Sequence, residues 1–191
     1  MSSMHKIGSV DVSELKAQID FHPELWDANE MRTRMFAISP HRDVSDIWLR
    51  YNPFENFDPK NPQAFACEHK TVNYPAWDLL PAAGEIIQSL LNEGDELGGC
   101  LITKILPGKC VYPHEDHGWN AEYYKDKILV LVQSDVKQDF RFYKKNCLIE
   151  RYVSETGDIY SFENQTKHAV FNESNIDRIS LIAAVRKKND T

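Results

Sequence analysis

The pattern of hydrophobic and polar positions divides the chain into a first half with helical signals and a second half with strand signals. Asp11-Val-Ser-Glu14 has the order of a capping box, which predicts a short helix that runs through about Ile19. The stretch 53–62 is rich in Pro, Asn and Asp, and we expect a loop there. Pro81 suits the first turn of a second helix, whose apolar positions recur with helical spacing until Gly94 closes it.

From residue 98 onward, short apolar or alternating runs are separated by turn residues. These runs predict strands over 100–106, 128–133, 140–143, 148–153, 158–162, 168–172 and 178–186. Many short strands at regular spacing indicate a β-sandwich or barrel. We therefore expect a mainly β protein with flanking helices, built as a double-stranded β-helix, the jelly roll of cupin-like proteins. Residues 1–97 would form a helical covering segment, packed on a jelly-roll core of residues 98–191 within one compact domain.

Composition narrows the class of protein. The chain has 191 residues, of which 42% are hydrophobic, so it can bury a substantial core. The formal net charge of −7 disfavours nucleic acid as a partner, because an acidic surface repels phosphate backbones. The sequence shows no signal-like start, no apolar run of membrane length and no C-x-x-C pair. We therefore expect a cytoplasmic protein with reduced thiols and no membrane partner.

The stretch VYPHEDHGWN, from Val111 to Asn120, concentrates the candidate chemistry. Pro113 limits strand pairing, so we expect a strand to end at Tyr112, with His114 and Asp116 just beyond it. Residues two apart in an extended chain point the same way, so one imidazole and one carboxylate can reach a common point. These are two of the three ligands in a 2-His-1-carboxylate metal site.

An H-x-D motif is weak evidence when it stands alone. His41-Arg42-Asp43 also matches the motif, but the strand order needed to close a site does not follow it. We interpret it as a capping or surface element. Glu115 and His117 are rival ligands within the loop, and we expect them to face solvent or to support the metal ligands.

A second histidine and an arginine follow in the order that completes a site. His168 opens the apolar strand His-Ala-Val-Phe-Asn and is the candidate third ligand. Arg178 and Ser180 are two apart on the last strand, so they share a face. The arginine fork suits a carboxylate, and the serine hydroxyl can donate beside it. Because a buried arginine needs a partner, a dicarboxylate cosubstrate fits better than an ion pair with Asp177 or Glu173.

This order of residues resembles that of the Fe(II)/2-oxoglutarate-dependent oxygenases, which carry H-x-D, a distal histidine and then an arginine. The stretches LPGKCVYPHEDHG and GDIYSFENQTKHAVFNESNIDRISLIAAV look like the aspartyl/asparaginyl β-hydroxylase-like branch, and the resemblance covers Gly98 to Val185. It implies a dioxygenase that uses Fe(II), 2-oxoglutarate and O2. Such an enzyme hydroxylates an aliphatic C–H, here of a free or peptidyl amino acid, and releases succinate and CO2. His114, Asp116 and His168 would hold the iron at the catalytic centre.

The resemblance also suggests roles for the remaining candidates. Arg178 and Ser180 would bind the far carboxylate of 2-oxoglutarate. The branch often carries R-x-H on the strand after the H-x-D loop, and the nearest match here is Lys127-Ile128-Leu129. Lys127 is therefore a further candidate for binding the cosubstrate. The candidate substrate contacts, of which the last would anchor an acidic group, are Trp119, Asn120 and Arg50.

Two other interpretations stay open on the residues alone. A cupin-type metal-dependent dioxygenase or isomerase would use the same three ligands without 2-oxoglutarate. A non-catalytic jelly-roll binding module would have no functional metal. The sequence leaves open the substrate, the position of hydroxylation and the oligomeric state.

Overall fold

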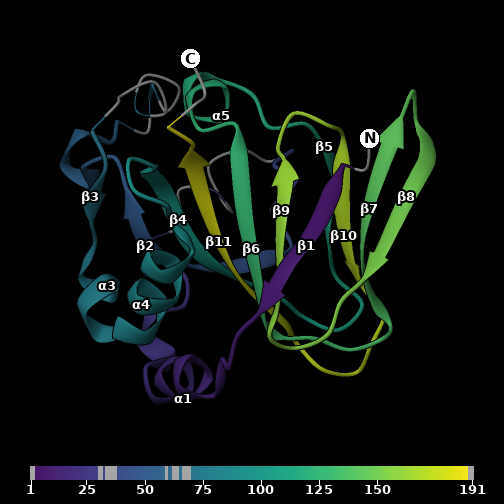
Figure 1. Ribbon diagram of the computed structural model, residues 1–191, viewed down its shortest axis with the longest axis horizontal. Helices are drawn as coiled ribbons and strands as arrows, with labels where there is room; N and C mark the ends of the chain where they lie inside the picture. Colours follow the sequence, from purple (N-terminus) through teal and green to yellow (C-terminus); the bar gives the residue numbers. More distant parts are fainter. Residues whose placement is uncertain are drawn as a thin grey trace.

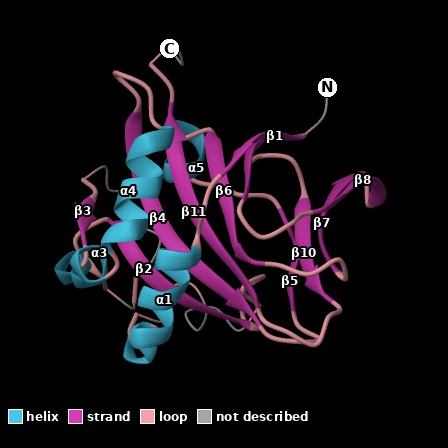
Figure 2. Ribbon diagram, turned by 60° about the horizontal axis from the view of Figure 1, so that its bottom comes forward, coloured by secondary structure: helices cyan, strands magenta, loops and turns pink. Residues whose placement is uncertain are grey.

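A computed structural model describes residues 3–29, 32, 38–58, 60–61, 65 and 70–188, without the side chain of Trp119. In these residues the chain forms two antiparallel β-sheets that face each other, with helices over the outer face of the larger sheet (Figures 1 and 2). The mainly β, jelly-roll architecture expected from the sequence is confirmed. No described helix is long and apolar enough to cross a membrane.

The larger sheet has the strand order β1-β9-β6-β11-β4-β2-β3. Its strands, in chain order, are β1 (Met4–Ser9), β2 (Val44–Tyr51), β3 (Val72–Asn73), β4 (Glu96–Ile105), β6 (Asp126–Gln133), β9 (Asp158–Glu163) and β11 (Arg178–Arg186). The smaller sheet has the order β5-β10-β7-β8. Its strands are β5 (Cys110–His114), β7 (Gln138–Lys144), β8 (Cys147–Val153) and β10 (His168–Asn172).

Four α-helices are described, and helices of the first half of the chain pack on the outer face of the larger sheet (Figure 2). The four helices are α1 (Ser13–Phe21), α3 (Pro75–Leu79), α4 (Pro81–Leu90) and α5 (Trp119–Tyr123), with 3-10 turns at Pro23–Leu25 and Phe54–Asn56. The expected loop over 53–62 includes the second of these turns, and its residues 59 and 62 lie outside the described residues.

Alternation along the central strands creates two hydrophobic layers. On β11, Ile179 and Leu181 join the layer formed with α1 and α4, whereas Arg178 and Ser180 face the opposite way, toward the smaller sheet. The second layer lies between the sheets and joins residues such as Leu131 of β6 to aromatic side chains of β7. Because side chains in a strand alternate between its two faces, the polar pair on β11 enters the space between the sheets.

The first 97 residues contribute two long strands that the sequence pattern did not indicate. β1 is an edge strand in which Met4 is buried and the other residues are exposed, so it carries no apolar alternation. β2 has five buried and three half-buried residues, and one of the buried residues, Asp46, is charged and has no exposed surface. The segment expected to cover the core therefore also supplies strands to its larger sheet.

The two predicted helices are present, with different ends. Helix α1 begins at Ser13 and continues to Phe21, and no side chain caps it as a capping box would. The Asp11 carboxylate instead accepts a hydrogen bond from the Ser13 N–H at 2.9 Å, closing a local turn before the helix. Helix α4 ends at Leu90, and Gly94 adopts a φ of 92° in the turn that follows.

Strand β5 continues past the point where the sequence placed its end. It runs through Pro113 to His114, and His114 pairs directly with His168 of β10. The prediction that the strand stops at Tyr112 was wrong because β5 lies at the edge of its sheet, where the missing N–H of proline breaks no interior ladder. This register places two histidines side by side.

Candidate active site

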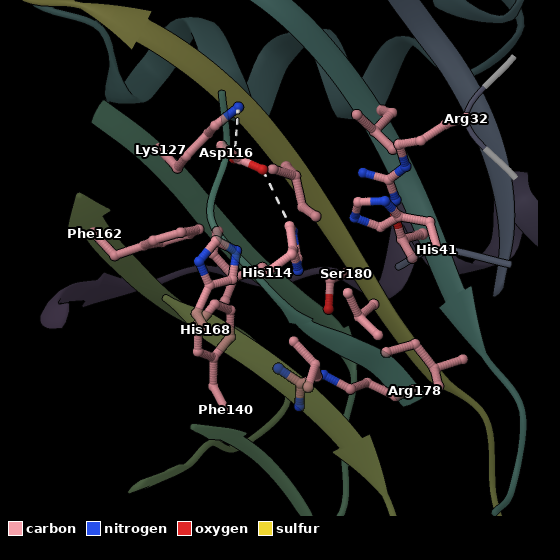
Figure 3. A pocket seen from close by; sticks show the side chains of 17 residues that line it. Arg32, His41, His114, Asp116, Lys127, Phe140, Phe162, His168, Arg178 and Ser180 are labelled. Atoms are coloured by element: carbon pink, nitrogen blue, oxygen red, sulfur yellow. Dashed lines mark hydrogen bonds and ion pairs between the residues drawn. The ribbon is translucent and has the colours of Figure 1, made fainter. Parts of the chain in front are cut away.

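A pocket opens between the two sheets, and the candidate residues of β5, β10, β6 and β11 meet in it (Figure 3). It encloses about 620 Å³, including the space at its mouth. Its polar lining residues are Arg32, His41, Thr103, His114, Asp116, Lys127, His168, Arg178 and Ser180. Apolar side chains, including Phe140 and Phe162, cover much of the remaining wall.

His114, Asp116 and His168 converge as the sequence order predicts. One ligand atom of each residue lies within 4.8 Å of the others, and no other such group of His, Cys, Asp or Glu occurs among the described residues. The His114 Nε2 atom is 3.4 Å from Asp116 Oδ1. The two imidazole rings have their centroids 4.4 Å apart. Two imidazoles and one carboxylate on neighbouring chain segments match a 2-His-1-carboxylate donor set.

Backbone carbonyls fix the orientation of both histidines. His114 Nδ1 lies 2.8 Å from the carbonyl oxygen of Tyr112, and His168 Nδ1 lies 2.8 Å from that of Thr166. A carbonyl oxygen can only accept, so each Nδ1 must carry the proton and donate it. In a neutral ring the Nε2 lone pair is then free to bind a metal ion, which is the usual outer support of metal-binding histidines.

Electrostatics keep two of the candidate ligands, His168 and Asp116, in protonation states that suit metal binding. Burial lowers the pKa of His168 from 6.5 to about 4, and the neighbouring His114 adds to the shift. Burial alone would raise the pKa of Asp116, but Lys127 and the two histidines together hold it well below its ordinary value. His168 is therefore neutral and Asp116 ionised at neutral pH.

Aromatic side chains surround His168 and restrict its ring. Phe140 stacks on it with a centroid distance of 5.4 Å, and Phe162 meets it edge-on at 5.7 Å. These contacts, with the Nδ1 hydrogen bond, leave the imidazole little freedom to rotate. They also make one side of the site apolar, which disfavours water there.

Arg178 lies deeper in the same pocket and is incompletely paired. Its side chain is buried, with a residue exposure of 1%. The Nη1 atom reaches the hydroxyl oxygen of Ser134 at 3.5 Å, and Nη2 has no hydrogen-bond partner among the described residues. Burial lowers the pKa of Arg178 to about 10, against the opposing influence of Asp139. A buried guanidinium with an unused donor is costly, so its position favours an acidic ligand in the pocket.

The acidic residues near Arg178 are engaged with other arginines. Glu173 Oε1 pairs with Arg141 Nη2 at 3.0 Å, and Asp139 pairs with both Arg141 and Arg151. Neither Glu173 nor Asp177 forms an ion pair with Arg178 in the described part of the chain. The alternative of a structural ion pair for this arginine therefore has no contact to support it.

Ser180 and Lys127 also line the pocket. Ser180 is buried on β11, on the same face as Arg178. Lys127 occupies the first position of the sequence that replaces R-x-H, and its Nζ atom is 3.7 Å from Asp116 Oδ2. The ammonium group thus sits beside the carboxylate of the candidate metal site, where it supplies positive charge.

Other candidates from the sequence fall elsewhere. Arg50 lines neither this pocket nor its outer neighbour, because its guanidinium donates to Asn73 and Thr71 at 2.7 and 2.8 Å. Asn120 donates to the Tyr51 hydroxyl at 3.0 Å and lines the outer pocket, and the side chain of Trp119 lies outside the described residues. Arg50 therefore has no place in the lining of either pocket, and its role as a substrate anchor stays a prediction.

Glu115 and His117, which lie beside Asp116 in the loop, do not belong to the group of three candidate ligands. His117 is 80% exposed, and its Nε2 atom lies 3.6 Å from the half-exposed Glu115 carboxylate. This pair fits the expected solvent-facing role. The short helix α5 follows directly, and His117 and Asn120 line the outer pocket instead of this one.

Two site residues were missed by the sequence interpretation, His41 and Arg32. His41 belongs to the H-x-D motif that we assigned to the surface, yet its ring lies 4.7 Å from that of His114, centroid to centroid. Asp43 of the same motif accepts a hydrogen bond from the Tyr112 hydroxyl at 2.8 Å and does not belong to the His114, Asp116 and His168 group. The motif gave no signal that β2 and its preceding turn would pack across the mouth of the pocket.

Comparison with known proteins finds solved structures that share this fold. No protein-family model matches the chain, and no curated protein matches it. An oxidoreductase of the 2OG-Fe(II) oxygenase family from Burkholderia pseudomallei superposes with a TM-score of 0.55 at 13% identity, covering 97% of this chain and 94% of that one. The collagen prolyl hydroxylase of Paramecium bursaria Chlorella virus-1, in complex with 2OG, gives a TM-score of 0.52 at 13% identity and covers 97% of both chains.

These matches establish a shared fold along nearly the whole chain. At 13% identity they establish nothing further about activity. The chain therefore has the fold seen in 2OG-Fe(II) oxygenases, and it places a His-Asp-His group between the sheets of that fold. Neither match bears on the aspartyl/asparaginyl β-hydroxylase-like branch, which stays a prediction.

Proposed function

We propose that this protein is an Fe(II)- and 2-oxoglutarate-dependent dioxygenase that hydroxylates an aliphatic C–H of an amino acid, free or within a peptide. One observation carries the proposal: a 2-His-1-carboxylate donor set and a buried arginine with an unused donor share one pocket. The fold shared with two oxygenase structures supports it. The amino-acid substrate follows from the branch resemblance.

His114, Asp116 and His168 would hold the iron. Their donor set fits a ferrous ion, because two imidazoles present free Nε2 atoms and the third ligand is an ionised carboxylate. When bound, the iron and 2-oxoglutarate supply the oxidation, in which O2 is consumed, 2-oxoglutarate becomes succinate and CO2, and one oxygen atom enters the C–H bond. The protein binds, orients and shields the reactants.

Arg178 and Ser180 would bind the far carboxylate of 2-oxoglutarate. The guanidinium has a free Nη2 in an apolar setting, where a charge-assisted hydrogen bond is strong. The Ser180 hydroxyl lies on the same strand face and can donate to the same group. Lys127 adds positive charge near Asp116, at the position that carries R-x-H in the branch.

Apolar side chains would protect the reacting centre from water. Leu129, Val170 and the two phenylalanines beside His168 line the pocket that holds both the candidate metal ligands and Arg178. Exclusion of water strengthens the electrostatic contacts to the cosubstrate and limits side reactions. This apolar lining is built from the inner faces of both sheets, so it is part of the core and needs no lid to form.

Turnover of 2-oxoglutarate tests the proposal. Purified protein with Fe(II), ascorbate and 2-oxoglutarate in air should form succinate, slowly without substrate. His168→Ala and Asp116→Ala should reduce the rate to the background of iron alone. His117→Ala, which changes a neighbouring histidine outside the triad, should keep it. A wild-type protein that binds metal but leaves 2-oxoglutarate unchanged would contradict the proposal and favour a metal-dependent jelly roll of another kind.

A further inference from the structure

A second, outer pocket adjoins the candidate active site and is the natural place for a substrate. It encloses about 780 Å³ including its mouth. The two pockets share part of their walls, and the shared residues are Arg32, His41, Leu101, Asp116, Lys127 and Ile182. A group bound in the outer pocket thus lies next to Asp116, the candidate metal ligand. The residues of the shared wall are the ones that such a group contacts. Figure 3 shows Arg32 and His41 together, across strand β11 from His114 and Asp116.

Hydrogen bonds to two buried residues hold the guanidinium of Arg32 in place. Its Nε and Nη2 atoms donate to the two carboxylate oxygens of Asp46 at 3.0 Å each, and Nη2 also donates to the Thr103 hydroxyl at 2.9 Å. Thr103 in turn donates to Asp46 at 2.8 Å. Asp46 is fully buried, so this network fixes the guanidinium plane.

The remaining nitrogen of Arg32 is available to a ligand. Nη1 makes no hydrogen bond with any described residue, and the side chain lines both pockets. The His41 ring also has no hydrogen bond within the described part of the chain, and it lies at the same boundary. A rigidly held guanidinium whose Nη1 is unbonded among the described residues, beside an imidazole, is a preorganised hydrogen-bond donor site for an oxygen ligand.

The charges around the two pockets leave room for one anion. Arg32, Lys127 and Arg178 carry three positive charges, and Asp46 and Asp116 carry two negative charges, which leaves one positive charge. A divalent metal ion and doubly charged 2-oxoglutarate cancel each other, so the surplus stays when both are bound. One substrate carboxylate would balance it.

We propose that Arg32 binds a carboxylate of the substrate at the junction of the two pockets, with His41 beside it. The inference rests on the proposed function and names the substrate class: a molecule with a carboxylate next to the C–H that is oxidised. It also gives Arg32 the anchoring role that the sequence interpretation assigned to Arg50. Asp46 and Thr103 are positioning residues, because they act only through the guanidinium.

Matched acids and amides test this assignment. The probes are the free L-amino acids with their carboxamides, and the N-acetyl amides of Asp and Glu with those of Asn and Gln. Binding is measured by calorimetry on protein loaded with Mn(II) and 2-oxoglutarate. We expect at least one acid to bind about tenfold more tightly than its amide, because a charge-assisted hydrogen bond is lost in the amide.

The variant must remove the charge of Arg32 without leaving a buried, unpaired carboxylate. Arg32→Gln combined with Asp46→Asn does this, and a cooperative melt confirms that the variant is folded. The acid and its amide should then bind equally, with 2-oxoglutarate affinity unchanged. Arg50→Gln changes an arginine on β2, the strand that carries Asp46, whose side chain is bonded away from both pockets, and this variant should keep the full preference.

Three results overturn the assignment: no acid binds wild-type protein better than its amide, the double variant retains the preference, or Arg50→Gln abolishes it. The same calorimetry on protein without metal or 2-oxoglutarate separates this inference from the proposed function. The residue charges favour an anion there as well. An acid preference in a protein that fails to turn over 2-oxoglutarate would therefore support the carboxylate site and contradict the dioxygenase.

Discussion

At the scale of single residues, the three candidate metal ligands could be picked out from the sequence because they occur in a fixed order at the ends of strands that the pattern predicts. What the sequence could not show is how each imidazole is held. Both histidines donate through Nδ1 to a carbonyl two residues earlier, Tyr112 and Thr166. Such bonds depend on backbone direction, not on residue type. His41 and Arg32 were missed for the related reason that a contact across the sheets leaves no local motif.

The buried charge of Arg178 and its unused Nη2 donor should lower the stability of the ligand-free protein. Arg178→Met removes a buried charge and an unused donor while keeping an unbranched side chain. We expect the ligand-free variant to be more stable than wild type by about 1–2 kcal/mol, seen as a melting temperature a few degrees higher. The same variant should bind 2-oxoglutarate at least about tenfold more weakly, because its charge-assisted contact is gone.

Arg141→Met is the matched control, since Arg141 pairs with Asp139 and Glu173 at 2.7 and 3.0 Å. It should lower the melting temperature and leave 2-oxoglutarate affinity unchanged. A lower melting temperature in ligand-free Arg178→Met would mean that the guanidinium has an internal partner, and would contradict its role as a ligand-binding group.

The depressed pKa of His168 predicts a loss of stability in acid. The pKa falls from 6.5 to about 4 on folding, chiefly through burial. As the pH drops below 6.5, the unfolded chain takes up a proton that the native state accepts only near pH 4. Native stability is therefore full above pH 6.5 and decreases toward pH 4, by up to about 3 kcal/mol. Urea unfolding of metal-free protein at several pH values measures this fall.

His168→Gln lacks the titrating group and serves as the comparison. Between pH 7 and 4 its stability should fall less steeply than that of wild type. Parallel curves for the two proteins would show that His168 does not contribute to the acid sensitivity.

At the scale of elements, strands with clear alternation and apolar content were predicted, and β1 and β2 were not. β1 exposes nearly all its side chains at the sheet edge, so it shows no apolar alternation. β2 buries a charged residue, Asp46, and the partner of that residue, Arg32, lies outside the strand in the sequence. The end of β5 was misplaced because the effect of Pro113 depends on whether a strand is central or at an edge. These properties belong to the assembled sheet.

The turn before β9 holds β1 in place and gives a test at this scale. Gly157 has a φ of 89°, and its carbonyl accepts from the Val10 N–H at 2.9 Å. A Cβ atom there would lie 2.6 Å from the Val10 carbonyl oxygen. Gly157→Ala should therefore destabilise the protein by about 2–4 kcal/mol, from backbone strain and a clash with main-chain atoms.

Gly108→Ala separates the two causes. Gly108 has a φ of 74°, but a Cβ there meets nothing within 4 Å, so only the backbone strain remains. Gly108→Ala should lower the free energy of unfolding by about 1 kcal/mol. Chemical denaturation of both variants gives the difference, and equal costs would show that the close approach of β1 to this turn adds nothing.

At the scale of the whole molecule, β1 and β2 belong to the larger sheet, so the core includes strands from the first 97 residues. We propose that residues 98–191 do not fold alone, although the sequence pattern placed the jelly-roll core there. β2 pairs with β4 and β1 pairs with β9, so the fragment would expose both neighbours. It would also lose the layer over α1 and α4.

A purified fragment of residues 98–191 should show no cooperative thermal transition by circular dichroism, whereas the full chain should melt cooperatively. A cooperative melt of the fragment would contradict the single-core description and would favour a separable N-terminal layer.

The central claim is that three side chains bind one ferrous ion and that Arg178 holds 2-oxoglutarate beside it. Anaerobic titration of the protein with Fe(II) and then 2-oxoglutarate, followed by visible absorption, tests this most directly. We expect a weak charge-transfer band that appears only when both are present, saturates at one equivalent of iron, and is absent in His168→Ala. Iron binding without such a band on addition of 2-oxoglutarate, or an undiminished band in His168→Ala, would contradict the claim.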